Sequence, residues 1–227
     1  MQGCTPFFMA APGFAVPCGL PMIIFDFDGT LVNSMHLCVT ELIRTFQDMN
    51  LPVPSQAELE KCNGPSHEEA AKLLKVPREL QAEFCRIRGG YQMSLMDSCQ
   101  KIYPGVPKML DILSACANLC IASNGRQEYV DRSLSNWGIG KYFVKAKGGD
   151  VAHTKGQLVG DLLKEYRPLR AVMVGDRLSD ILAGKENGLH TVAAAYGFGS
   201  LEEWQEADKQ VHSVEELTDI CLQFCGR

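Results

Sequence analysis

The chain has 227 residues, 46% of them hydrophobic, which is enough for one large domain or for one domain with a smaller insertion. Its formal net charge of -5 at pH 7 argues against the basic surface typical of proteins that bind nucleic acid or anionic membranes. We therefore expect neither nucleic acid nor a membrane among its partners.

Residues 1–21 are predicted to form an irregular N-terminal extension. They contain no Lys or Arg, and Pro6, Pro12, Pro17 and Pro21 interrupt any helix. A secretory signal needs a positive start and a continuous apolar core, and neither is present in these residues. No later apolar run is long enough to span a bilayer. The ten cysteines fit a reducing compartment better than a disulfide scaffold, so we expect a cytoplasmic location.

The first predicted strand, residues 22–26, ends in a pair of carboxylates. Its apolar residues lead directly into Asp26, and Asp28 follows two positions later. Like charges this close repel each other, and each loses hydration on burial. Because a chain tolerates such a pair where a cation or a reaction needs it, the sequence indicates a functional site at the end of this strand.

Residues 34–101 show helical patterns and no convincing strand. Helices are expected at 36–49, 55–62, 66–74 and 78–97, and Gly89-Gly90 is expected to weaken or kink the last one. This segment is predicted to be an all-helical cap inserted after the first strand. An insertion at that point is well placed to act as a lid over the site.

From residue 102 onward, short apolar strands alternate with helices. Further strands are expected at 118–123, 142–145, 170–175 and 190–194, with helices at 106–116, 126–136, 154–166 and 177–187. A short strand or turn near Val211 and a helix from about Ser213 complete the chain. The alternation predicts an α/β fold, in which residues 22–33 and 102–227 form a Rossmann-like parallel sheet core.

Polar groups follow three more of these elements at one edge of the predicted sheet, where ligands bind in open parallel sheets. Ser123 and Asn124 end the second strand, and Asp176 follows the strand at 170–175. Asp180 comes one helical turn later, and Lys155 lies at the start of the helix at 154–166. Together with the first pair of carboxylates, they indicate a metal-dependent phosphoryl-transfer site.

The residue types suggest separate roles in such a reaction. The Asp26 carboxylate can attack phosphorus and form an aspartyl-phosphate, while Asp28 can act first as general acid and then as general base. Gly29 permits a tight turn close to the phosphoryl group, and Thr30 is a supporting residue of the same turn. Asp176 is expected to join Asp26 in binding a hard cation, Mg²⁺.

The remaining groups are expected to hold the phosphate. The hydroxyl of Ser123 and the backbone N–H of Asn124 can donate to phosphate oxygens, and Lys155 can neutralise the charge that develops on them. Asp180 can bind a water on the metal or orient Lys155.

These motifs resemble those of the haloacid-dehalogenase superfamily. The resemblance covers about residues 22–200 and rests on Asp26-Phe-Asp28-Gly-Thr-Leu-Val, Ser123-Asn124, Lys155 and Gly175-Asp176-x-x-x-Asp180. It implies that Asp26 is the nucleophile and that Asp28 acts as acid and base while its backbone carbonyl joins Asp26 and Asp176 at Mg²⁺. The predicted insertion resembles the small α-helical cap of this family. Asp28 argues against dehalogenases and phosphonatases, which lack the second acid.

Residues 154–159 and 197–200 resemble the phosphoglycolate-phosphatase-like branch of that superfamily. The resemblance implies a Mg²⁺-dependent phosphatase of a small phosphate monoester, with 2-phosphoglycolate as one candidate. A sugar phosphomutase and an inorganic pyrophosphatase on the same scaffold are alternatives. A phospho-accepting signalling domain is a further alternative, but receiver domains are shorter and have no cap.

Several choices stay open on the sequence alone. Lys145 and Lys147 compete with Lys155, which is favoured because it opens an amphipathic helix with Thr154 as a possible cap. The loop at 63–67 is a candidate substrate selector or an ordinary turn. Arg86 and Arg88 are weaker candidates for binding a substrate carboxylate. No coiled-coil pattern is present, and the oligomeric state is open.

Overall fold

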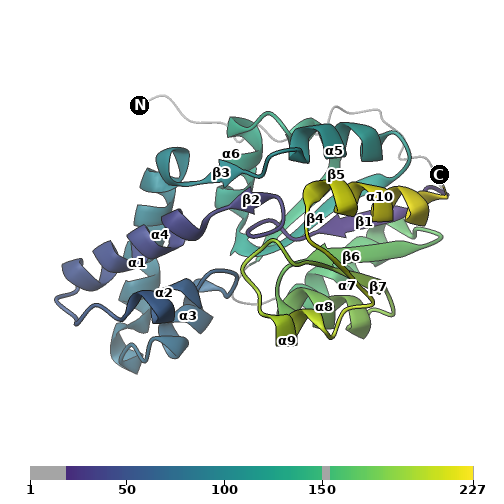
Figure 1. Cartoon of the computed structure of the whole chain (residues 1–227). Helices are drawn as coiled ribbons and strands as arrows, with labels where there is room; N and C mark the ends of the chain where they lie inside the picture. Colours follow the sequence, from purple (N-terminus) through teal and green to yellow (C-terminus); the bar gives the residue numbers. More distant parts are fainter. Residues whose placement is uncertain (1–18, 150–153, 227) are drawn as a thin grey trace.

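The computed structural model describes residues 19–149 and 154–226. Most of the expected N-terminal extension, residues 1–18, lies outside the described residues. Figure 1 shows an α/β core beside a helical module that contains α1 to α4. Among the helices of the described part, none is long and apolar enough to cross a membrane.

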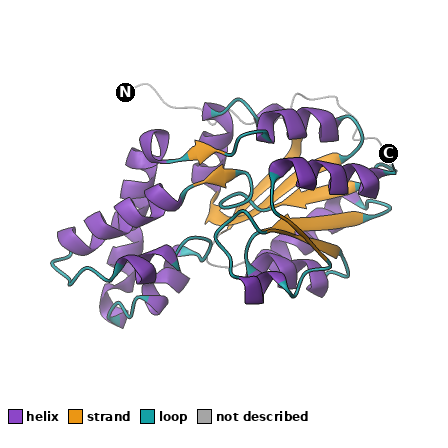
Figure 2. Cartoon of the chain, in the orientation of Figure 1, coloured by secondary structure: helices purple, strands orange, loops and turns teal. Residues whose placement is uncertain are grey.

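The core is a six-stranded sheet in the order β5-β4-β1-β6-β7-β8, and every pairing in it is parallel (Figure 2). The strands are β1 Met22–Phe25, β4 Asn118–Arg126, β5 Phe143–Gly149, β6 Ala171–Gly175, β7 His190–Ala194 and β8 Lys209–Val211. This arrangement confirms the predicted Rossmann-like α/β core. Because β1 pairs with both β4 and β6, the ends of these three strands are neighbours.

Helices cover both faces of the sheet because alternate strand residues point to opposite sides. Ile23 and Phe25 belong to the larger hydrophobic cluster, which also contains residues of α5, α6 and α10. Met22 and Ile24 belong to a second cluster with residues of α7 and α8. The helix bounds are α5 Val106–Ser114, α6 Gln127–Asn136, α7 Lys155–Tyr166, α8 Leu178–Glu186 and α10 Val214–Cys225.

The helical module has a hydrophobic cluster of its own, whose buried members lie between Cys38 and Cys85. Its helices are α1 Met35–Asp48, α2 Gln56–Glu60, α3 His67–Leu73 and α4 Gln81–Cys99, and the 3-10 helix η1 Arg78–Leu80 precedes α4. The α4 helix runs through Gly89 and Gly90 without interruption, so the expected weakening or kink at these glycines stays a prediction. Gly89 leaves room for the guanidinium of Arg126, which approaches from the core.

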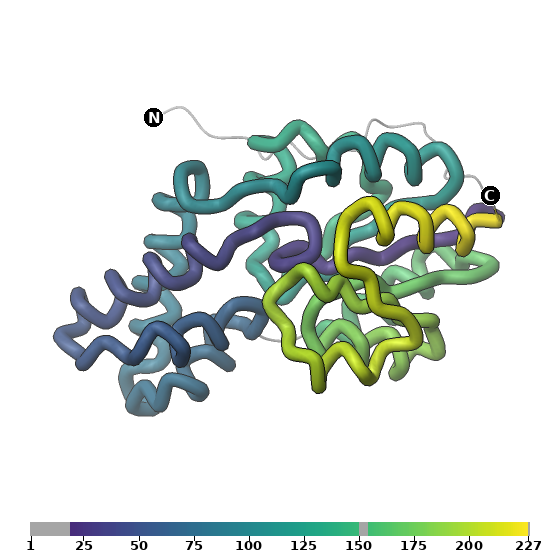
Figure 3. The backbone as a smooth tube through the Cα atoms, in the orientation of Figure 1, coloured from purple at the N-terminus to yellow at the C-terminus, as the bar shows by residue number. Residues whose placement is uncertain are grey.

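A two-stranded antiparallel ribbon, β2 Val32–Asn33 with β3 Lys101–Ile102, was missed by the sequence analysis. It pairs the segment that leaves the core with the segment that returns to it, as Figure 3 lets the reader follow. Each strand has only two residues, which is too short for an alternating pattern to be recognised. The short elements η2 Gly140–Tyr142 and α9 Leu201–Trp204 were not predicted either.

Candidate active site

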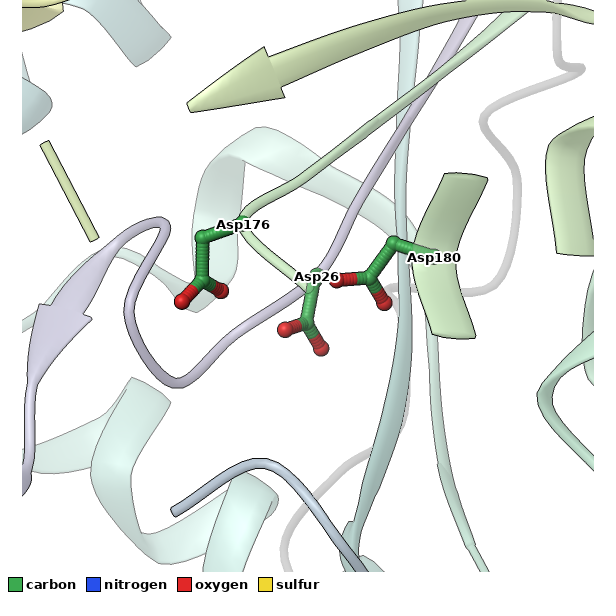
Figure 4. Close-up of side chains that lie close together, drawn as sticks. All are labelled: Asp26, Asp176 and Asp180. Atoms are coloured by element: carbon green, nitrogen blue, oxygen red, sulfur yellow. The ribbon is translucent and has the colours of Figure 1, made fainter. Parts of the chain in front are cut away.

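Three buried carboxylates converge where β1 and β6 end. Asp26 follows β1, Asp176 follows β6, and Asp180 lies in the first turn of α8 (Figure 4). One carboxylate oxygen from each lies within 4.8 Å of the others, and all three residues are buried. The backbone N–H of Asp26 donates to the carbonyl of Val174 at 2.8 Å, so the pairing of β1 with β6 extends to the first of these acids.

Lys155 reaches this cluster from the start of α7. Its Nζ donates to Oδ1 of Asp26 at 2.7 Å and to Oδ1 of Asp180 at 2.5 Å. Thr154 caps α7, as the sequence predicted, because its side chain accepts from the backbone N–H of Gln157. The structure therefore places Lys155 beside the expected nucleophile and places Asp180 where it orients that lysine.

The other two candidate lysines lie on β5. Lys147 is directed to α7, where its Nζ lies 3.9 Å from Asp161 and 3.6 Å from Glu165. Lys145 pairs in register with Cys120, one strand away from β1. Of the three lysines, Lys155 is the one that the structure joins to Asp26.

The Asp176 side chain is held by the turn after β7 and by the turn after β1. Its Oδ2 accepts from the backbone N–H of Phe198 at 2.7 Å, and its Oδ1 accepts from the hydroxyl of Thr30 at 3.4 Å. Gly29 has a φ of +85° and packs against the same carboxylate, which a Cβ at that position would overlap. The turn at Gly29 therefore needs both the left-handed conformation and the missing side chain.

Replacing Gly29 with alanine is expected to destabilise the fold and to lower activity, because the new methyl group displaces the Asp176 carboxylate. Gly188→Ala is the matched control, since Gly188 has a φ of +68° and its Cβ would meet no atom within 4 Å. The control is expected to lose only the backbone term, about 1–2 kcal/mol of unfolding free energy. Denaturant unfolding should show a larger loss for Gly29→Ala, and equal losses in the two variants would contradict this account.

The carboxylate cluster carries more negative charge than one lysine neutralises. Burial first, and then the charge of Asp180, raise the pKa of Asp26 to about 7, although Lys155 opposes both. Burial and the charges of Asp26 and Asp180 raise the pKa of Asp176 well above its ordinary value. Burial disfavours the charged form of Lys155, but Asp180 and Asp26 outweigh it and raise its pKa. This set of hard oxygen donors fits a divalent cation such as Mg²⁺.

Asp28 is not one of these three clustered acids, and its side chain contacts α6. Its Oδ1 accepts a hydrogen bond from the hydroxyl of Tyr129 at 2.6 Å. Burial raises the pKa of Asp28, while hydrogen bonds from Ser34 and Tyr129 oppose that shift. A raised pKa favours the protonated form of the carboxyl group, which is the form that a general acid needs. The two carboxylates of the first motif thus occupy different environments.

Ser123 and Asn124 lie near the end of β4 and line a pocket that also contains Asp26 and Asp28. Ser123 is buried, and its hydroxyl accepts from the backbone N–H of Gly125 at 3.0 Å. The side chain of Asn124 donates to the carbonyl of Gly64 in the helical module at 3.0 Å. The Asn124 side chain therefore joins the core to the loop at 63–67, and binding of phosphate by Ser123 and Asn124 remains a prediction.

The same loop closes one side of a pocket between core and module. Arg177 of the core donates to the carbonyl of Asn63 at 2.5 Å, which adds to the contact of Asn124 with Gly64. The centres of water-sized molecules can occupy only about 30 Å³ of the pocket. Its walls include Asp26 and Asp28 from the core, together with residues of α1, α3 and α4. The pocket is therefore narrow, and the module covers it.

Sequence analysis named Arg88 and the loop at 63–67, which ends in His67, as candidates on the module side of this pocket, but it missed Glu41. Glu41 on α1 and Arg88 on α4 form a buried ion pair, with Nε of Arg88 2.7 Å from Oε1 of Glu41. His67, at the start of α3, is also buried and lines the pocket. Glu41 stands on the apolar face of the predicted helix 36–49, and a charged residue there was the available signal. Arg86, by contrast, is exposed and pairs with Glu83.

Comparisons with known proteins relate the chain to a family of hydrolases. A family model described as haloacid dehalogenase-like hydrolase matches residues 23–194. The tyrosine-protein kinase PtkA of Mycobacterium tuberculosis is 27% identical over 184 residues, covering 78% of this chain and 63% of PtkA. The chain therefore spans less than two thirds of the length of that relative.

A second relative matches over nearly its whole length. The phosphoglycolate phosphatase of Vibrio parahaemolyticus is 27% identical over 225 residues, covering 88% of this chain and 96% of that protein. Among solved structures, a haloacid dehalogenase-like family hydrolase from Streptococcus pneumoniae has a TM-score of 0.82 at 22% identity, covering 88% of this chain and 98% of the other. At that identity, the structural match shows a shared fold.

Proposed function

The chain belongs to the haloacid dehalogenase-like hydrolase family, and we propose that it is a Mg²⁺-dependent phosphatase of a small phosphate monoester. The observation that carries this proposal is the placement of Asp26. Its buried carboxylate accepts a hydrogen bond from Lys155 and lies close to the carboxylates of Asp176 and Asp180. Asp26 also lines the same pocket as Asp28. This arrangement would bring a nucleophile, a cation site and a second acid together where β1 and β6 end.

The proposed reaction has two steps. A carboxylate oxygen of Asp26 attacks phosphorus, the bond between phosphorus and the ester oxygen breaks, and Asp28 gives its proton to that oxygen so that an alcohol leaves. Asp28 then takes a proton from water, whose oxygen attacks the aspartyl-phosphate. Inorganic phosphate leaves, and the Asp26 carboxylate is restored.

The other residues would position charge during both steps. Asp26, Asp176 and the backbone carbonyl of Asp28 would hold Mg²⁺, which when bound supplies positive charge beside the phosphoryl oxygens. Lys155, oriented by Asp180 through the 2.5 Å hydrogen bond, would neutralise the same oxygens. The hydroxyl of Ser123 would donate to one of them.

The narrow pocket supports a small substrate. The helical module, residues 34–101, would act as a cap that opens at the β2–β3 ribbon and closes through Asn124 and Arg177. Similarity to a phosphoglycolate phosphatase supports 2-phosphoglycolate as one candidate of suitable size. A cytoplasmic location belongs to the same proposal and is supported by the buried thiols of Cys38, Cys62 and Cys120.

The proposal predicts metal-dependent phosphate release from a panel of small phosphate monoesters and pyrophosphate. Release is expected with Mg²⁺ and is expected to fall to background with EDTA, because the buried carboxylates then repel the anionic substrate. Free phosphate measured over time tests this. Best release from pyrophosphate would favour the pyrophosphatase alternative. Isomerised product with little free phosphate would favour the phosphomutase, and no reaction from folded, Mg²⁺-loaded protein would refute the proposal.

A further inference from the structure

A cluster of buried polar side chains on the helical module faces the reacting groups across the pocket. It consists of Glu41, His67 and Arg88, whose exposed fractions are 1%, 7% and 3%. All three line the same pocket as Asp26 and Asp28. The cluster comes from three different helices, so its assembly is a property of the folded module.

Several atoms of this cluster have no hydrogen-bond partner within the described residues. Glu41 and Arg88 bind each other through Oε1 and Nε, but Oε2 of Glu41 and Nη1 of Arg88 are unpaired there. Neither ring nitrogen of His67 has a hydrogen bond of good geometry in that part of the chain, although the backbone of Cys85 lies close enough to oppose the lowering of its pKa. Buried polar atoms are rarely left in this state, because each has lost its hydration without replacement. A ligand in the pocket would supply the missing partners.

We propose that Glu41, Arg88 and His67 bind hydroxyl groups of the leaving group, so that the preferred substrate is the phosphate monoester of a small, uncharged polyhydroxy compound. This inference rests on the proposed phosphatase function and assigns its substrate class. Asp28 marks where the leaving oxygen lies, and the charge of Arg88 already acts on Asp28. The rest of the leaving group would therefore extend toward α1 and α4.

The hydrogen-bonding groups of the cluster match hydroxyls better than carboxylates. Oε2 of Glu41 accepts, and Nη1 of Arg88 donates. Burial, together with the charges of Arg88 and Arg126, lowers the pKa of His67 well below its ordinary value, although the backbone of Cys85 opposes this shift. The neutral ring has one donor and one acceptor. A hydroxyl group can both donate and accept, whereas a carboxylate only accepts and would meet the Glu41 oxygen unfavourably.

Charge balance leads to the same substrate class. Burial raises the pKa of Glu41 to about 7 against the opposing charge of Arg88. Above that pH Glu41 and Arg88 neutralise each other, so the module side of the pocket has no surplus positive charge for a second anionic group. The core side already carries Asp26 and Asp28 and must also accept the phosphoryl group. A leaving group with its own negative charge, as in 2-phosphoglycolate or pyrophosphate, would add repulsion.

The test compares kcat/KM for three esters: glycerol 3-phosphate, 2-phosphoglycolate and phenyl phosphate. Wild-type protein is expected to prefer glycerol 3-phosphate by about tenfold or more, since buried groups that lack their partner discriminate strongly against the wrong substrate. In Glu41→Gln, the ratio of kcat/KM for glycerol 3-phosphate to kcat/KM for phenyl phosphate is expected to fall by about the same factor. Arg86→Gln, an exposed change on the same helix as Arg88, is the matched control and should keep the wild-type ratio.

Because Glu41→Gln leaves the Arg88 charge unpaired, the double variant Glu41→Gln/Arg88→Gln provides a second test without a buried charge. A wild-type preference for 2-phosphoglycolate or phenyl phosphate would overturn the inference while leaving the phosphatase function intact. An unchanged substrate ratio in both variants would do the same. If no ester is hydrolysed, the phosphatase proposal fails, and calorimetry with wild-type protein decides the inference separately. Tighter binding of glycerol 3-phosphate than of inorganic phosphate would support it, and equal binding would overturn it.

Discussion

Phosphate release is expected to fall by at least about a thousandfold when Asp26 is replaced by asparagine, because the amide cannot form the aspartyl-phosphate. The substitution keeps the size of the side chain and an oxygen that can accept from Lys155, which lies 2.7 Å from the carboxylate. The residual rate in the presence of Mg²⁺, measured with the best ester of the panel, provides the comparison with wild type.

The same variant is expected to stay folded. Burial and the Asp180 charge raise the pKa of Asp26 to about 7, above its value in an unfolded chain. As the pH rises from the unfolded pKa of Asp26, 3.8, to its folded pKa of about 7, ionisation of Asp26 lowers the stability of the fold. Asparagine carries no such charge. Without Mg²⁺ at pH 8, Asp26→Asn should melt no lower than wild type. Full activity in a folded Asn variant would contradict the role of Asp26, whereas lost activity with a much lower melting temperature would not support it.

Replacement of Asp28 by asparagine is expected to lower turnover of an alkyl phosphate by about 10²–10⁴-fold, the range of general acid–base catalysis. For 4-nitrophenyl phosphate, Asp28→Asn should lose much less rate in the first step, because nitrophenolate leaves without a proton. The second step still lacks its base, so a burst of nitrophenol followed by slow turnover is expected. Rapid-mixing measurements with both esters separate the two steps.

Tyr129→Phe is the control for the Asp28 variant, because it removes the 2.6 Å hydrogen bond to Asp28 and keeps the carboxyl group. It is expected to shift the pH dependence of turnover toward a higher pKa for Asp28, with a smaller loss of rate. Equal losses for alkyl and nitrophenyl esters in Asp28→Asn, without a burst, would contradict the acid–base role.

Much of the fold was predictable from sequence because its central strands are short apolar runs followed at once by polar residues. Residues 22–25 and 171–175 are buried, and an aspartate directly follows each run. Lys155 was predictable for a similar reason, since Thr154 is a helix cap and therefore places the lysine in the first turn of α7. These are local signals, and each lies within a few residues of the group that it positions.

The module side of the pocket depends on contacts between distant residues. Glu41 and Arg88 are 47 positions apart on different helices, and their pairing follows from how α1 packs on α4. The pattern around Glu41 shows only that a charged residue interrupts an apolar face. The β2–β3 ribbon has the same character, because Val32 pairs with Ile102 across the whole module. Such contacts are set by tertiary packing, which helix and strand periodicities do not encode.

The most direct test of the central claim is mass spectrometry of protein quenched in acid during turnover. Asp28→Asn protein with 4-nitrophenyl phosphate and Mg²⁺ is the best sample, because its second step is slowed. We expect one added phosphoryl group on the peptide that contains Asp26, and none on that peptide when Asp26 is also replaced by asparagine. A phosphoryl group on another residue, or none on Asp26 while nitrophenol is released, would contradict the account.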